Sequence, residues 1–150
     1  MFIFTIEWGE IKMTGIYQHT IDAKGRLAIP ARLRDELGDT FHVTLSTEKC
    51  LTAYPNESWN EMKERNKELP LLGQIEMRPL FSHAAKCELD AQGRILLPQA
   101  LRDFADLKKI VCIVGIGERV QIWDADQWAA IDEIETTPEY IRGIFEKLGV

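Results

Sequence analysis

The sequence is poor in metal-binding and redox side chains. It has three cysteines without a C-x-x-C pair, and its three histidines do not have the spacing of zinc ligands. Each cysteine lies in an apolar or strand-like stretch, so we expect all three to be small core residues. The six residues are Cys50, Cys87, Cys112, His19, His42 and His83. We therefore predict no metal site and no cofactor.

Long apolar runs and enzyme motifs are also missing. No run approaches the roughly 20 apolar residues that cross a bilayer. The opening "MFIFTIEWGEIK" lacks a basic start and contains Glu7, which is unlike a secretion signal. There is no H-E-x-x-H, no G-x-x-x-x-G-K-[ST] and no G-x-G-x-x-G motif. We expect a cytoplasmic protein that is not an enzyme and has no membrane partner and no small-molecule ligand.

The chain also lacks the net positive charge that is typical of nucleic-acid-binding proteins, because its formal net charge is −6. The acids are unevenly placed, however. The window Asp124 to Glu139 holds six acids and no lysine or arginine, which equals the whole net charge. The window Tyr17 to Arg34 has a local charge of +3, and Lys86 to Arg102 has +1. A solvated surface is one interpretation of these cations, and a nucleic-acid contact is the other.

What the sequence does contain is an internal repeat. "DAKGRLAIPARLRDEL" at Asp22 to Leu37 recurs 68 residues later as "DAQGRILLPQALRDFA", with half of the positions identical. "CLTAYPNESW" at Cys50 to Trp59 recurs, offset by 69, as "RVQIWDADQW". Two copies are too few for a solenoid, and half of a 150-residue chain is marginal as a separate domain. We therefore predict that the copies pair about a pseudo-two-fold axis and bury their apolar faces against each other.

Each half is predicted to run strand, turn, strand, short helix, strand, strand, helix. "RLAIP" alternates apolar and polar positions, and Pro30 is expected to end the strand and begin a helix with Leu33 and Leu37 inward. Further strands are predicted at 41–46 and 110–115, and helices at about 56–68 and 74–85. Thr137 and Pro138 predict the start of a C-terminal helix with an apolar stripe. The fold class is α+β.

The repeated D-x-x-x-R turns are the candidate site. Asp22 and Arg26 can approach across a turn at Gly25, where the carboxylate accepts backbone N–H bonds or orients the arginine, with Lys24 at the tip. These pairs could simply stabilise turns. Their repetition beside other cations favours contact with phosphates and guanine edges instead. The candidate DNA-binding residues are Lys24, Arg26, Arg94, Arg32 and Arg34, supported by Asp22, Gly25, Asp90 and Gly93.

The segments "YQHTIDAKGRLAIPARLRDEL", "CLTAYPNESW", "CELDAQGRILLPQALRDFADL" and "VQIWDADQW" resemble the MraZ family of bacterial transcriptional regulators. The resemblance covers about Met13 to Glu146. It implies two SpoVT/AbrB-like swapped-hairpin units that form one pseudo-two-fold β barrel with flanking helices. It also implies a nucleoid-associated repressor that binds short direct repeats upstream of its own division and cell-wall gene cluster. The family forms rings of about eight to twelve subunits, whose many copies of the motif offset weak single contacts.

The resemblance sets the expected boundaries. We predict unit 1 at 17–59, a helical linker at 60–84, unit 2 at 85–128 and a C-terminal helical segment at 129–150. Residues 1–12 form an N-terminal extension and are expected to pack poorly, with Met13 as a candidate start. His83 stands where the family commonly has glycine.

Two further expectations concern function. Because Gln92 replaces Lys24 in the second copy, the first copy is expected to dominate phosphate contact, while the second supports assembly. The rival hypotheses are an AbrB-type antitoxin that neutralises a protein partner, and a scaffold ring that does not bind DNA.

Overall fold

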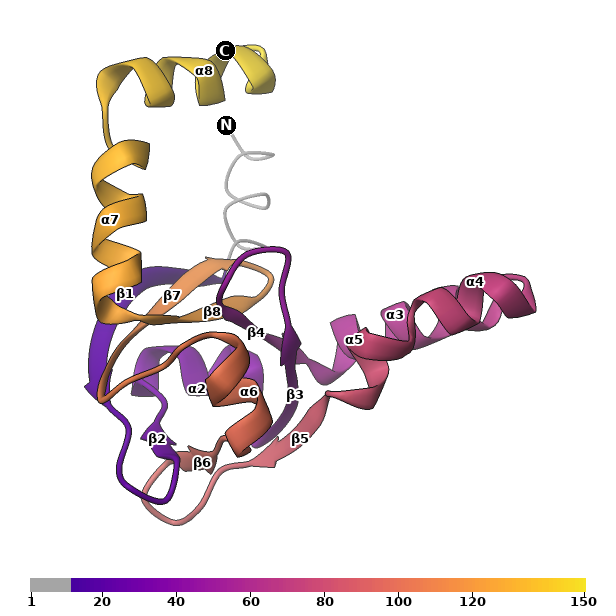
Figure 1. Ribbon diagram of the computed structural model, residues 1–150. Helices are drawn as coiled ribbons and strands as arrows, with labels where there is room; N and C mark the ends of the chain where they lie inside the picture. The colour runs from indigo at the N-terminus through magenta and orange to yellow at the C-terminus, as the bar shows by residue number, and fades with distance from the viewer. Residues whose placement is uncertain (1–11) are drawn as a thin grey trace.

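The computed structural model describes residues 12–150 and has an α+β fold. The two halves repeat one order of elements (Figure 1). The first half consists of β1 (Met13–Thr20), β2 (Arg26–Ala28), α2 (Ala31–Leu37), β3 (Thr40–Leu45), β4 (Leu51–Pro55) and α3 (Asn56–Lys67). The second consists of β5 (Ala85–Glu88), β6 (Arg94–Leu96), α6 (Gln99–Phe104), β7 (Ile110–Gly117), β8 (Val120–Asp124) and α7 (Ala125–Glu135). The predicted order is confirmed in both halves, while the expectation for residues 1–11 lies outside the described residues.

The first strand of each half pairs with the third strand of the other half. The large sheet has the order β1-β7-β8-β4-β3-β5, so β1 lies against β7 and β5 against β3, all antiparallel. In the separate β2–β6 ribbon, Leu27 pairs with Ile95, its repeat equivalent. In the β4–β8 pair, Thr52 likewise faces its equivalent, Gln121. Both pairs lie on one pseudo-two-fold axis, which confirms the predicted pairing of the copies.

The sheet is open and does not close into the predicted barrel. Among residues 12–150, backbone hydrogen bonds join six strands in one sheet and leave β2 and β6 as a two-stranded ribbon. β2 and β6 have three residues each and are soon followed by Pro30 and Pro98. Because proline has no N–H to donate, both strands stay short, and within residues 12–150 they pair only with each other.

Both copies contribute to one core. The predicted alternation in β2 is confirmed, since Leu27 is completely buried and the neighbouring Arg26 and Ala28 are half-buried. The equivalent apolar positions of the two copies belong to a single cluster: Leu27, Ile29, Leu33, Leu37, Ile95, Leu97, Leu101 and Ala105. Full burial of each leucine or isoleucine side chain stabilises the fold by about 1.5–3 kcal/mol. A half-chain would leave much of this surface in water.

A repeated aromatic pair anchors the helix that ends each unit. Tyr54 and Trp59 have ring centroids 5.9 Å apart, and Trp123 and Trp128 repeat this distance. From these anchors the helices leave the sheet in different directions (Figure 1). Helix α3 continues into α4 (Leu71–Glu76) and α5 (Arg78–Ser82), and together they form an arm that projects from the body. Helix α7 leads to α8 (Pro138–Leu148) at the opposite end from the β2–β6 ribbon.

The helices predicted at 56–68 and after Thr137 are confirmed, whereas the one at 74–85 is confirmed only in part, because α4 already begins at Leu71 and Ala85 belongs to β5. The segment predicted as one helix over 74–85 is two short helices, because Pro79 at the start of α5 interrupts the helical hydrogen bonding. His83 at the end of α5 has φ −96°, a conformation that does not require glycine. Thr137 caps α8 as predicted, and its hydroxyl accepts a hydrogen bond from the Tyr140 N–H. No helix within residues 12–150 has both the length and the apolarity to cross a bilayer.

Candidate nucleic-acid interface

The first D-x-x-x-R turn is a closed hydrogen-bonded loop. The Gly25 N–H donates to the Asp22 carbonyl at 3.0 Å, and Gly25 has φ +89°, where a residue with a side chain would be strained. The Asp22 carboxylate accepts the N–H groups of Lys24 at 3.0 Å and Arg26 at 2.9 Å through Oδ1. Its Oδ2 accepts the Arg26 Nε–H at 2.6 Å. Asp22 therefore both shapes the turn and orients the arginine.

The second turn repeats this geometry. Asp90 Oδ1 accepts the N–H groups of Gln92 and Arg94, both at 2.9 Å, and Oδ2 accepts the Arg94 Nε–H at 3.0 Å. The Gly93 N–H donates to the Asp90 carbonyl at 3.0 Å, with Gly93 at φ +75°. The predicted Asp–Arg approach is therefore confirmed in both copies.

These bonds favour the ionised carboxylates. The backbone N–H of Arg26, followed by its side chain and the Lys24 N–H, lowers the pKa of Asp22 to about 2. The Arg94 backbone N–H and then that of Gln92 lower the pKa of Asp90. Both ion pairs are therefore intact at neutral pH, and the arginine side chains are held in one orientation.

The two turns flank the short β2–β6 ribbon at one end of the molecule, and the antiparallel pairing places one turn at each end of that ribbon (Figure 1). Leu27 and Ile95 point into the core from this ribbon, so the alternating positions point outward. The outward positions are Arg26, Ala28, Arg94 and Leu96, of which Leu96 is 59% exposed. Arg26 pairs with Leu96 and Ala28 with Arg94, so the arginines lie diagonally across the ribbon. The outward face of the ribbon is therefore a narrow surface that carries two arginines and has the hydrophobic core beneath it.

The helix arginines cross between the units. Arg34 follows the first turn in sequence, but its guanidinium lies against Gly93 of the second turn. Its Nε donates to the Ile29 carbonyl at 2.7 Å. Arg102 of α6 lies in the same way against Gly25 of the first turn, with Nε donating to the Leu97 carbonyl at 3.0 Å. The two positively charged segments, 17–34 and 86–102, therefore do not form two separate surfaces, because each places a helix arginine beside the turn of the other unit.

The surroundings of the two turns differ in charge. Lys24 is exposed at the tip of the first turn, where the second turn has the neutral Gln92. The hollow beside the second turn is lined by Arg34 and by three carboxylates, Asp35, Asp39 and Asp90. Carboxylates repel phosphate, so the second turn is the poorer anion site. Arg32 is exposed on α2, and its repeat equivalent is Ala100.

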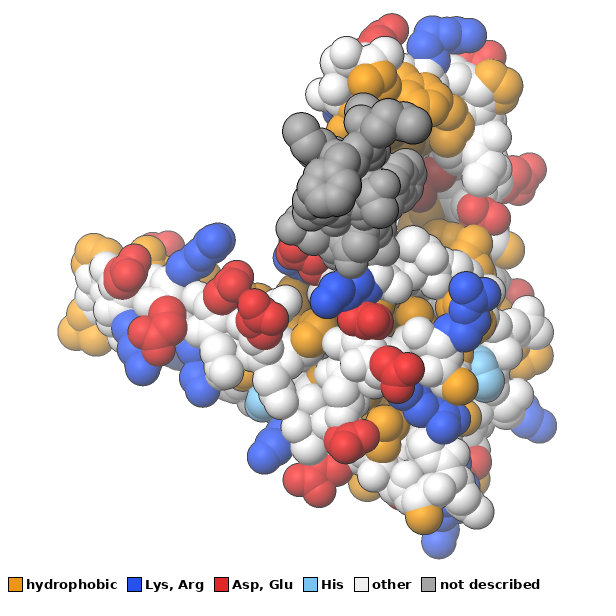
Figure 2. All heavy atoms as spheres, turned by 180° about the vertical axis from the view of Figure 1, so that it is seen from behind, with side chains coloured by type: hydrophobic (Ala, Val, Ile, Leu, Met, Phe, Trp, Pro, Cys, Tyr) orange, Lys and Arg blue, Asp and Glu red, His pale blue; other side chains and the backbone are white. Residues whose placement is uncertain are grey.

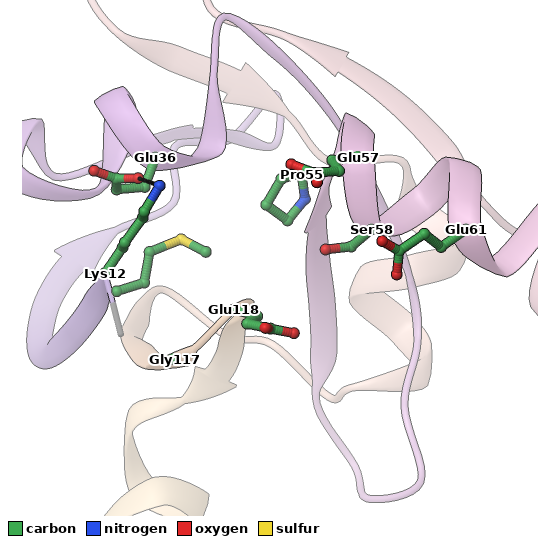
Figure 3. A pocket seen from close by; sticks show the side chains of 9 residues that line it. Lys12, Glu36, Pro55, Glu57, Ser58, Glu61, Gly117 and Glu118 are labelled. Carbon is green, nitrogen blue, oxygen red and sulfur yellow. Dashed lines mark ion pairs between the residues drawn. The ribbon is translucent and has the colours of Figure 1, made fainter. Parts of the chain in front are cut away.

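The acidic part of the chain lies at the far end. Of the six acids of 124–139, Asp124 is buried at the end of β8, and the other five belong to α7 and the start of α8, opposite the ribbon (Figure 1). A second acidic surface is a hollow of about 310 Å³, lined by Glu36, Glu57, Glu61 and Glu118 with Lys12 (Figure 3). Lys12 pairs there with Glu36 at 3.8 Å. The α3–α5 arm carries acidic and basic side chains intermixed (Figure 2). None of these surfaces suits a polyanion.

The described residues offer little other chemistry. Within residues 12–150 no cluster of histidine, cysteine, aspartate or glutamate could hold a metal ion. The three cysteines are buried, as predicted. Burial raises the pKa of the Cys50 thiol to about 11 and that of Cys87 to about 12, so both are protonated and unreactive at neutral pH.

Sequence reasoning missed two members of this surface. Arg102 was not selected, although it stands 68 residues after Arg34, and the repeat spacing alone could have identified it. Leu96 was not selected because only the β2–β6 register reveals that it points outward between the arginines. The crossing of Arg34 and Arg102 has no sequence signal, since it depends on how the units pair.

Comparison with known proteins identifies the family. The family model described as "MraZ protein, putative antitoxin-like" matches residues 13–76 and 80–137, one match for each half. A transcriptional regulator MraZ from Heliobacterium modesticaldum is 45% identical over 137 residues, covering 89% of this chain and 94% of the relative. Those from Carboxydothermus hydrogenoformans and Alkaliphilus metalliredigens are 49% and 41% identical, covering 76% and 91% of this chain and 82% and 98% of theirs. The transcriptional regulators of this family are not enzymes. The chain belongs to the MraZ family of transcriptional regulators and consists of two MraZ repeats.

Proposed function

We propose that the protein is a sequence-specific DNA-binding repressor that contacts its own promoter through the β2–β6 ribbon. The observation that carries this proposal is the convergence of both D-x-x-x-R turns on one outward ribbon surface, with each arginine fixed by a carboxylate. A two-stranded ribbon fits the major groove of B-DNA, where arginine is the commonest ligand of guanine. The short direct repeats that the family resemblance implies would match a repeated surface of this kind.

The contacts are divided among the cations by their positions. Arg26 and Arg94 face the bases or the nearest phosphates from the ribbon, and Lys24 and Arg32 add phosphate contacts from exposed positions. Arg34 is a flanking cation whose Nε is already bonded to Ile29. Arg26 contributes more than Arg94, because Lys24 lies beside it while Asp35 and Asp39 line the hollow beside the second turn.

The net charge of −6 is compatible with this function if many weak contacts act together. We propose that the chain assembles into a homo-oligomeric ring of about eight to twelve subunits, so that several ribbons engage successive repeats. The separation of α7 from the ribbon keeps most of the acidic window away from the DNA (Figure 1). In this proposal the two units span 17–59 and 85–128 and pair as SpoVT/AbrB-like hairpins. The protein acts in the cytoplasm, where it associates with the nucleoid.

The antitoxin hypothesis explains fewer of these features. An antitoxin needs a surface for a protein partner, and the matching family description is antitoxin-like. Such proteins usually have one unit and a disordered tail, whereas this chain has two units and a C-terminal helix. The scaffold-ring hypothesis does not explain why a carboxylate orients each of the two arginines on the outward face of the ribbon.

The proposal is tested by removing the first ribbon arginine. Arg26→Ala is expected to weaken binding to duplex DNA from upstream of the gene by roughly 5- to 150-fold and to reduce the salt dependence of the affinity. Gel-shift titration at two salt concentrations measures both. Arg94→Ala should cost less. The matched control is Arg65→Ala on the exposed face of α3, which removes the same charge and should leave the affinity within about twofold. Equal affinities for Arg26→Ala and the control would refute DNA contact by the ribbon.

A further inference from the structure

The crossed arginines connect each helix to the turn of the other unit. Arg102 lies on α6 in the second unit, and its Nε donates to the Leu97 carbonyl at 3.0 Å. The N–H of Leu97 in turn donates to the carbonyl of Gly25 in the first turn at 2.9 Å. The peptide groups of Leu97 thus join Arg102 to the loop that holds Arg26.

The pseudo-symmetry-related path has the same bonds. Arg34 Nε donates to the Ile29 carbonyl at 2.7 Å, and the Ile29 N–H donates to the Gly93 carbonyl at 2.9 Å. Gly93 belongs to the turn that holds Arg94. The same arrangement occurs in both units, although the side chains around the two turns differ. This repetition indicates a feature of the fold and not a chance contact.

The glycines of the turns make room for these guanidinium groups. A side-chain carbon at Gly25 would lie 2.9 Å from the guanidinium carbon of Arg102 and 2.8 Å from the Leu97 carbonyl oxygen. At Gly93 such a carbon would collide with the guanidinium of Arg34. Arg102 and Arg34 are half-buried, and the guanidinium of each lies close to the glycine in the turn of the opposite unit.

We propose that Arg102 and Arg34 are positioning residues that act across the unit boundary. Arg102 holds the first turn, and so sets the presentation of Lys24 and Arg26, while Arg34 holds the second turn and Arg94. The role in DNA binding rests on the proposed function, but the holding of the turns does not. The planar guanidinium suits this role because its Nε–H can bond a carbonyl while its face covers a glycine, which an ammonium group cannot do.

The positioning claim is tested without DNA, by hydrogen exchange and mass spectrometry on the full chain. Arg102→Met keeps the aliphatic stem but loses the donor. It is expected to speed amide exchange over residues 22–27 about 10-fold and to leave 90–95 within twofold. Arg34→Met is its matched control and should give the reverse pattern. Faster exchange in the turn of the same unit, in both turns equally, or in neither would overturn the proposal. If either methionine variant fails to fold, the corresponding lysine variant, which keeps the charge, is measured by the same criteria.

A double-mutant cycle then tests the consequence for DNA affinity. Arg102→Met should weaken binding in the wild-type background but add less than about twofold once Arg26 is alanine, because both changes disable one turn. Combined with Arg94→Ala, its effect should be fully additive. The opposite pairing, or a loss that Arg102→Lys restores completely, would assign Arg102 to direct contact through its charge. Because the exchange pattern is independent of DNA, it also separates failure of this inference from failure of the proposed function.

Discussion

At the scale of single residues, Asp22 and Asp90 are the only carboxylates of the two D-x-x-x-R turns. Each accepts two backbone N–H groups and one arginine Nε–H, and each is only partly exposed. The carboxylate therefore joins two functions, because the same group that closes the turn also aims the arginine. Neutralising it should loosen the turn and release the side chain together.

This coupling predicts a pH dependence of stability. The pKa of Asp22 is about 2 in the folded protein and 3.8 as the ordinary value, so ionisation favours the folded state. Its contribution is complete above pH 3.8 and is lost as the pH falls toward 2. Asp22→Asn should therefore have a lower Tm than the wild type at pH 7, with the difference shrinking as the pH is lowered.

Thermal unfolding of both proteins between pH 7 and pH 2.5 measures this difference. The matched control is Asp126→Asn on α7, whose carboxylate is exposed and far from the turns. A difference in Tm between wild type and Asp22→Asn that stays constant down to pH 2.5 would mean that the ionised carboxylate does not stabilise the turn.

At the scale of elements, the short β2–β6 ribbon depends on glycines in the turns that lead into it. Gly25 and Gly93 have φ of +89° and +75°, which strain any residue with a side chain. Their neighbours differ, because Gly25 faces a backbone carbonyl as well as Arg102, whereas Gly93 faces only the end of the Arg34 side chain among its nearest atoms. A flexible side chain can move aside, but a carbonyl in the core-facing chain cannot.

The predicted order of stability follows from these contacts. Gly25→Ala should lower the free energy of unfolding by about 1–3 kcal/mol, and Gly93→Ala by less. Gly143→Ala is the control, since this helical glycine has no atom within 4 Å of the added carbon and should be neutral or up to about 1 kcal/mol more stable. Urea unfolding measures all three. A larger loss for Gly93→Ala than for Gly25→Ala would contradict the account of the first turn.

The individual helices and strands could be predicted from the sequence, but the way in which they pair could not. Strand alternation around Leu27, the stop at Pro30 and the cap at Thr137 are local signals, and the structure confirms each of them. The open sheet and the crossing of Arg34 and Arg102 were not predictable, because they depend on which strand of one copy pairs with which strand of the other. The paired residues lie 66 to 104 positions apart in the sequence, and no periodicity in the sequence predicts such pairings.

At the scale of the whole molecule, the two copies form one folding unit. β1 hydrogen-bonds to β7, and β5 to β3, so each half completes the sheet of the other. The equivalent core positions also belong to one cluster. The repeat therefore gives the molecule two turns at one end and a core that neither copy can close alone.

This organisation predicts the behaviour of the halves. Fragments 12–76 and 77–150, prepared separately, should not unfold cooperatively as monomers, because each leaves half of the shared core in water. Mixed together, they should associate and recover the circular-dichroism signal of the intact chain. Sedimentation and thermal unfolding check this, and a monomeric half with its own cooperative transition would contradict the shared core.

Site-specific photo-crosslinking tests which end of the molecule meets DNA. A photo-crosslinking residue such as p-benzoylphenylalanine replaces either Lys24 at the tip of the first turn or Glu133 on α7, both of which are exposed. After irradiation with duplex DNA from upstream of the gene, we predict crosslinks from position 24 that excess unlabelled duplex removes, and none above background from position 133. Crosslinking from position 133 that equals or exceeds that from position 24 would contradict the proposal that the ribbon faces DNA.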